Sequence, residues 1–143
     1  MVRLVLEGVD AFTEALKKMP DDFATRVHGI VYTTAEHTVS ELHGAYPPRR
    51  PNSRSRFEPL QNVWYVESKD KGPLHPIAKV AHREILADWR EHGTKPRVTK
   101  KGWGRGRMPP APVFVPIVVR DRRVMNQILV ELAQQIGLTV TGG

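Results

Sequence analysis

The sequence contains no cysteine, which excludes disulfide bonds and thiolate metal sites and is compatible with a reducing compartment without proving one. It also lacks any run that approaches the roughly 18 consecutive apolar residues needed for a membrane span. The first ten residues, MVRLVLEGVD, have no basic region followed by a long apolar run, so we expect no cleaved leader. From these absences we expect a soluble, unprocessed protein that does not contact a membrane.

Positive charge is concentrated in the middle of the chain. Residues 46–107 hold 15 lysines and arginines against 6 acidic residues, and the flanks hold the remaining 7 basic and 9 acidic residues. The middle therefore carries +9 and the flanks −2, which gives the net charge of +7. Such a patch attracts polyanions, although a basic loop surface can equally provide solubility or meet an acidic protein neighbour. Both interpretations stay open at this point.

The N-terminal half shows helical periodicity. The 143 residues, 40% of them hydrophobic, fit one domain spanning 1–143. We expect a short strand at 2–6, then a helix that Asp10 caps and Pro20 ends. A longer helix is predicted from Pro20 to Leu42, because apolar residues recur along one face of this stretch.

The C-terminal half alternates between strand and helix patterns. Residues 60–68 and 77–83 are rich in β-branched and aromatic residues, so we predict an antiparallel hairpin with its loop at 69–76. Residues 84–92 fit either a helix ended by Gly93 or a continuing strand. A final helix follows and runs to Ile136, where Gly137 is the expected end. Together these elements predict an α+β fold in which a small antiparallel sheet packs against two long helices.

Two segments cannot contribute to a core, and we predict that they form extended basic arms. Residues 46–59 contain four prolines, which prevent both a helix and a central strand. Residues 95–109 belong to a loop longer than about 12 to 15 residues, and such loops are usually functional or disordered. We expect both arms to be mobile in an isolated subunit and cut first by proteases. The predicted subunit or DNA contacts are Arg49, Arg50, Arg54, Arg56, Lys95, Arg97, Lys100, Lys101, Trp103, Arg105 and Arg107.

Residue types suited to catalysis or metal binding occur in two places. Glu84, Asp88, Glu91 and His92 would fall near one side of a helix, as in a carboxylate site for a divalent ion. The favoured alternative is a solvated polar face, with Arg83 and Arg90 as ion-pair partners. The earlier helix carries His28, Glu36, His37, Glu41 and His43, but no histidine pair has the i, i+4 spacing of a metal-binding helix. We therefore predict no catalytic, cofactor-binding or metal-binding residues, and a protein that is not an enzyme.

A group of short motifs resembles a known family. Glu91, Gly93 and Thr94 in REHGT precede a variable polar stretch, and APVFVP, with Ala111, Pro112, Phe114 and Pro116, opens the final helix. The N-terminal LEGVDAFTEALKKMP also resembles the opening of that family. In order and spacing the chain resembles the neck or tail-completion proteins of long-tailed bacteriophages. It departs from them in having AYPPRRPNSRSRFEPL where many members have a Pro-Val-Arg-Thr-Gly-Xaa-Leu segment.

The resemblance implies a structural role at the junction between phage head and tail. It implies a homo-oligomeric ring of six or twelve copies, with six slightly favoured, that contacts neighbouring connector and tail proteins within the virion. Contact with passing genomic DNA would not depend on base sequence. The competing interpretation is a small basic nucleic-acid-binding protein that acts outside the virion. The expected structural anchors of the folded frame are Trp89, Gly93, Pro112, Phe114 and Pro116.

Overall fold

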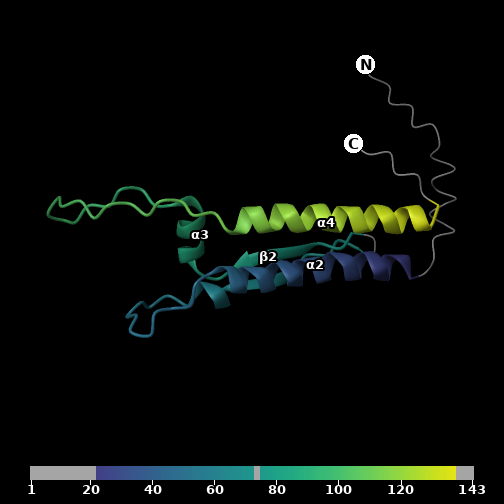
Figure 1. Ribbon diagram of the computed structural model, residues 1–143, viewed down its shortest axis with the longest axis horizontal. Helices are drawn as coiled ribbons and strands as arrows, with labels where there is room; N and C mark the ends of the chain where they lie inside the picture. Colours follow the sequence, from purple (N-terminus) through teal and green to yellow (C-terminus); the bar gives the residue numbers. More distant parts are fainter. Residues whose placement is uncertain (1–21, 73–74, 138–143) are drawn as a thin grey trace, which may run out of the picture.

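The computed structural model describes residues 22–72 and 75–137. The strand expected at 2–6 and the helix expected at 10–19 lie outside the described residues. Two long helices, α2 (Phe23–Ala45) and α4 (Phe114–Gln135), lie side by side. An antiparallel hairpin of β1 (Trp64–Ser68) and β2 (Ala78–His82) packs against α2 (Figure 1). The predicted α+β class is confirmed.

Helix α2 follows the predicted periodicity. Ala35, Thr38 and Leu42 are its buried residues and recur at helical spacing. The helix ends at Ala45, because Tyr46 is extended and precedes Pro47. A residue before proline is disfavoured in the helical region, so the first proline of the 46–59 segment stops the helix.

The hairpin forms where the sequence predicts it. Val66 pairs with Val80 at its centre, and Lys69 donates a backbone hydrogen bond to Ile77 at 2.8 Å beyond the strand ends. The carboxylate of Asp70 accepts the Ile77 N–H at 2.7 Å and the hydroxyl of Tyr32 at 2.9 Å. Asp70 therefore links the hairpin loop to α2.

Residues 84–92, for which the sequence allowed either a helix or a strand, form a helix. This helix is α3 (Ile85–His92). A single 3-10 turn, η1 (Leu60–Asn62), lies just before the hairpin. Gly93 ends α3 with a φ of +75°, as predicted, although its ψ of −177° lies outside the left-handed helical region. Among the described helices, none is long and apolar enough to cross a membrane.

The buried core lies at the end of the molecule where α3 meets both long helices. Leu42 and Val63 are fully buried, and Trp64 is only 5% exposed. The Trp64 ring stacks between two other rings, with centroids 5.0 Å from Phe114 and 6.2 Å from Tyr46. Aromatic stacking of this kind adds to the free energy gained by burial. The core thus joins α2, β1 and the first residue of α4.

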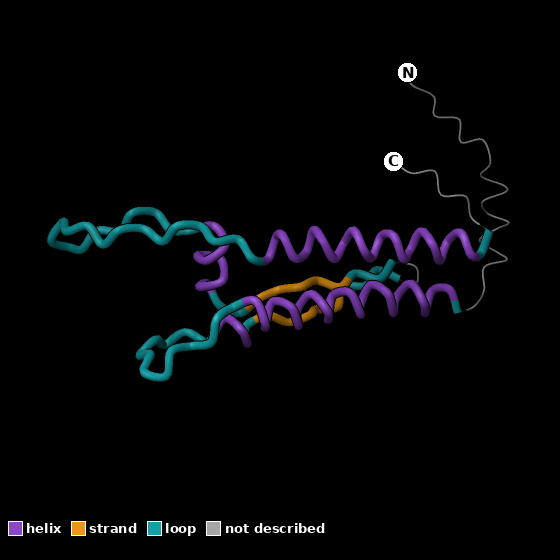
Figure 2. The backbone as a smooth tube through the Cα atoms, in the orientation of Figure 1, coloured by secondary structure: helices purple, strands orange, loops and turns teal. Residues whose placement is uncertain are grey.

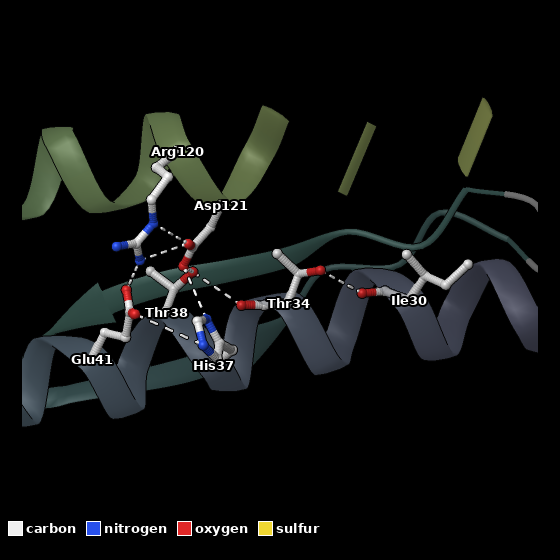
Figure 3. A network of polar contacts seen from close by, with 7 residues as sticks. All are labelled: Ile30, Thr34, His37, Thr38, Glu41, Arg120 and Asp121. Carbon is white, nitrogen blue, oxygen red and sulfur yellow. Dashed lines mark hydrogen bonds and ion pairs between the residues drawn. The ribbon is translucent and has the colours of Figure 1, made fainter. Parts of the chain in front are cut away.

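A polar network joins α2 to α4 (Figure 3). Asp121 on α4 is 5% exposed and accepts the Thr38 hydroxyl at 2.7 Å and the Arg120 Nη2 at 2.9 Å. His37 lies 3.4 Å from the same carboxylate, and Arg120 also pairs with Glu41. Burial alone would raise the pKa of Asp121, but hydrogen bonds from Thr38, Arg120 and His37 outweigh it and lower the pKa. The carboxylate is therefore held in its charged form.

We predict that Asp121→Asn lowers the free energy of unfolding by about 2 kcal/mol at pH 7, because hydrogen bonds to a charged group are lost. The folded-state pKa of Asp121 is depressed, so its contribution is present above the unfolded value and disappears as pH falls below about 4. Urea denaturation at several pH values should show the gap between wild type and variant closing in that range. A gap that is independent of pH would contradict this assignment. Glu131→Gln, which removes an exposed carboxylate from the same helix, is the control.

Candidate interaction surface

Glu91 caps the start of α4 from the neighbouring helix α3. Its side chain is 8% exposed, and Oε1 accepts the backbone N–H groups of Val113 and Phe114, each at 2.8 Å. These groups have no partner within their own helix, and a carboxylate at this end also interacts favourably with the helix dipole. The Tyr46 hydroxyl donates to the same oxygen at 3.3 Å. Burial, together with the charge of Glu91 and this hydrogen bond, raises the pKa of Tyr46.

Gly93 and Thr94 fix the chain that leaves α3 against the chain that returns to α4. A Cβ atom at Gly93 would lie 2.7 Å from the Met108 carbonyl oxygen and 2.9 Å from the Pro110 nitrogen. Only glycine permits both this contact and its positive φ. Thr94 exchanges two hydrogen bonds of 2.9 Å with Met108, one from its backbone N–H and one to its hydroxyl. Ala111 donates a further backbone hydrogen bond of 2.8 Å to Arg90.

Glu91 of the first motif and Phe114 of the second therefore meet in space. We call the contacts among residues 90–94 and 108–114 the α3–α4 junction.

We predict that Glu91→Gln lowers the free energy of unfolding by about 1 to 2 kcal/mol. The helix dipole of α4 loses its negative partner, and the buried N–H₂ group of the glutamine finds no hydrogen-bond acceptor. Glu36→Gln, at an exposed position of α2, is the control and should change stability little. Equal urea midpoints for both variants would contradict the capping role.

The segment predicted as an extended arm at 95–109 is a hydrogen-bonded β-ribbon. Thr99 donates to Trp103 at 2.8 Å and Arg105 to Arg97 at 2.7 Å. Arg97 in turn donates to Gly106 at 3.0 Å. Arg105 and Gly106 therefore both lie opposite the single residue Arg97, which is a β-bulge. The sequence interpretation missed this pairing. Figures 1 and 2 show the ribbon projecting past the end of α4; we call residues 94–108 the basic ribbon.

The basic ribbon carries only positive charge. Arg97 forms backbone hydrogen bonds with both Arg105 and Gly106 across the bulge, and the Trp103 carbonyl accepts one from Thr99. Like charges placed opposite each other are destabilising, and residues 94–112 contain no acidic side chain. Trp103 is 73% exposed, and Val98 is 70% exposed. Such a surface suits an anionic partner.

The segment 46–59, expected to be an extended arm, is a loop that leaves the end of α2 and returns to the domain (Figure 1). The Phe57 ring meets the Trp89 ring edge to face, with centroids 6.0 Å apart. Gln61 donates a side-chain hydrogen bond of 3.1 Å to the Tyr46 carbonyl, which closes the loop at its base. Trp89, predicted as an anchor, therefore holds this loop to α3. We call residues 46–59 the arginine loop.

The arginine loop and the basic ribbon lie at the same end of the molecule, on either side of α3 (Figure 1). All four arginines of the loop and all six lysines and arginines of the ribbon are exposed. The expected mobility of these two segments in an isolated subunit stays a prediction, to be checked by limited proteolysis.

Phe114 stacks in the core, whereas Pro112 and Pro116 are exposed on either side of it.

The structure separates the side chains considered for metal binding at 84–92. Glu91 faces α4, whereas Asp88 lies 3.1 Å from His82. The proposed ion-pair partners are also wrong, because Arg83 lies over the Tyr65 ring and Arg90 forms no ion pair within the described residues.

His37, Glu41 and Asp121 bring potential ligand atoms within 4.8 Å of one another. Arg120 already contacts both carboxylates of this group, so the arrangement is that of an ion-pair network. Sequence reasoning considered His37 and Glu41 but missed Asp121, which comes from a helix 80 residues further along the chain. No local pattern signals such a contact.

Comparison of the chain with models of known protein families, with curated proteins and with solved structures finds no match.

Proposed function

We propose that this protein is a non-enzymatic structural subunit of the head–tail junction of a long-tailed bacteriophage, in its neck or tail-completion layer. In this role six or twelve copies, with six favoured, form a ring in the virion that joins the DNA-filled head to the tail. The observation that carries the proposal is the joint position of the arginine loop and the basic ribbon at one end of the molecule. One end of each subunit would then face DNA or a neighbouring connector protein.

The α3–α4 junction supports the family assignment on physical grounds. Glu91, Gly93 and Thr94 resemble one family motif, and Phe114 belongs to the other. Glu91 accepts the Phe114 N–H, whereas Gly93 and Thr94 pack against Met108 and Pro110 in the chain that leads to Phe114. The junction holds the base of the basic ribbon on α3. A protruding element that contacts other subunits requires such a fixed base.

Exposed apolar side chains support a role in an assembly. Nine large hydrophobic residues among those described are at least 36% exposed. Five of them lie on α4, which packs only one side against α2. Single exposed apolar residues are common on monomers, but Val115 and Val119, one turn apart on the same side of α4, suit burial against a neighbouring subunit. These five residues are Val115, Val119, Val124, Ile128 and Val130.

The rival function is a small basic nucleic-acid-binding protein that acts outside the virion. The basic ribbon favours it, because it combines exposed arginines with the exposed aromatic ring of Trp103, which suits nucleic acid. Molar mass by light scattering at moderate salt, together with duplex DNA affinity across salt concentrations, separates the two. The proposed function predicts oligomers and weak binding that is independent of base sequence. A monomer with tight, salt-sensitive binding would favour the rival.

A further inference from the structure

The arginine loop closes over a pocket of about 260 Å³ against α3 and η1. Its polar lining comes mainly from Arg49, Arg50 and two serines of the loop, and from Arg90 of α3. The loop is held in this shape by hydrogen bonds from the Arg49 guanidinium to the carbonyls of Ser53 and Ser55. The pocket is therefore a folded feature of the loop and is distinct from the basic ribbon.

Positive charge in this pocket is not neutralised by the protein. Three arginines line it, against the single acidic residue Glu58. None of the three forms an ion pair within residues 22–72 and 75–137. The Nε atom of Arg90 is buried and has no hydrogen-bond partner there. A buried charged donor without a partner is costly, and an anion beside the Arg90 guanidinium would offset that cost.

The two serines add neutral donors. The Ser53 hydroxyl oxygen accepts the Ser55 N–H, and the Ser55 hydroxyl oxygen accepts the Phe57 N–H, both at 3.3 Å. A hydroxyl that accepts a hydrogen bond keeps its own hydrogen to donate. Guanidinium groups and hydroxyls that line one pocket offer several donors to the oxygens of a phosphate, an anion that arginine commonly binds.

We propose that this pocket binds a phosphate group. The group has two sources with the same chemistry, a backbone phosphate of nucleic acid or free inorganic phosphate. A backbone phosphate would be held without reading the base sequence, as phosphate contacts generally are. The inference does not depend on assembly into a ring, because the pocket is formed within one subunit.

Titration of the full-length, isotope-labelled protein with inorganic phosphate at constant ionic strength tests the site by NMR. We expect saturable shifts at the backbone amides of the loop and at the Arg90 Nε–H. Arg50→Gln should weaken binding about tenfold to a hundredfold, the range of a hydrogen bond to a charged group. Arg54→Gln is the matched control, because Arg54 belongs to the same loop but does not line the pocket. Equal affinity of both variants, or unsaturable shifts spread over the surface, would overturn the proposal.

A second arm uses a short DNA duplex to identify the source. If backbone phosphate occupies the pocket, Arg50→Gln lowers duplex affinity more than Arg54→Gln, and inorganic phosphate competes with the duplex at the loop amides. If free phosphate is the ligand, both variants lose duplex affinity equally while only Arg50→Gln loses inorganic phosphate. A pocket that binds neither probe would refute the inference and leave the proposed ring untouched, since ring formation is measured separately by molar mass.

Discussion

Replacing Lys100, Lys101, Arg105 and Arg107 together with serine should leave a folded subunit that fails in particle assembly. All four side chains are exposed on the basic ribbon, which contributes none of the buried core residues. Exposed charges each contribute little to stability, so the free energy of unfolding should stay within about 1 kcal/mol of wild type. Electron microscopy of lysates should show heads and tails that do not join stably, or joined particles that leak or fail to deliver DNA.

The matched control for this variant removes four positive charges from the opposite end of the molecule. Arg26, Lys69, Lys71 and Lys79 are exposed, and three of them form only surface ion pairs. Replacing these four with serine should leave joining intact if position, and not net charge, is what matters. Infectious virions from the ribbon variant would refute the assembly role of the ribbon. Normal particles with altered DNA or RNA metabolism would favour the rival function.

Truncating Phe114 to alanine should unfold or severely destabilise the subunit. The ring stacks on buried Trp64 at 5.0 Å, and its backbone N–H is held by Glu91. Loss of a buried phenylalanine side chain costs about 3 to 5 kcal/mol. The lower end of that range is expected here because Phe114 is only half-buried. A domain stable by about 5 to 15 kcal/mol would lose a large part of its margin.

Urea denaturation followed by circular dichroism measures this loss. The midpoint should fall without a change in the slope, because the surface exposed on unfolding stays similar. Val115→Ala is the control, since Val115 is the next residue along α4 and is 53% exposed. An unchanged midpoint for Phe114→Ala would mean that the start of α4 is not anchored in the core, and the α3–α4 junction would then be wrongly described.

Elements set by local patterns could be predicted from the sequence. Helix α2 has an apolar stripe at helical spacing and a proline just after its end. The β1–β2 hairpin has two β-rich runs separated by a polar loop. Gly93 was expected to end a helix because a positive φ suits glycine, and α3 does end there.

Features that depend on distant residues could not be predicted. Glu91 was assigned to a polar face, because nothing near it in the sequence reveals that its partners are backbone N–H groups more than 20 residues away. The ribbon at 94–108 contains glycines and no alternating apolar residues, so its pairing leaves little trace in the sequence. The pocket under the arginine loop likewise joins Arg90 to residues about 40 positions earlier. Such contacts exist only after the chain has folded.

A reconstruction of purified virions by electron cryomicroscopy is the most direct test of the proposed function. At the head–tail junction we expect a closed ring of this subunit, with the arginine loop and the basic ribbon on the side that meets DNA or the adjoining connector protein. Particles that lack the protein altogether, or that carry it away from the head–tail junction, would contradict the account.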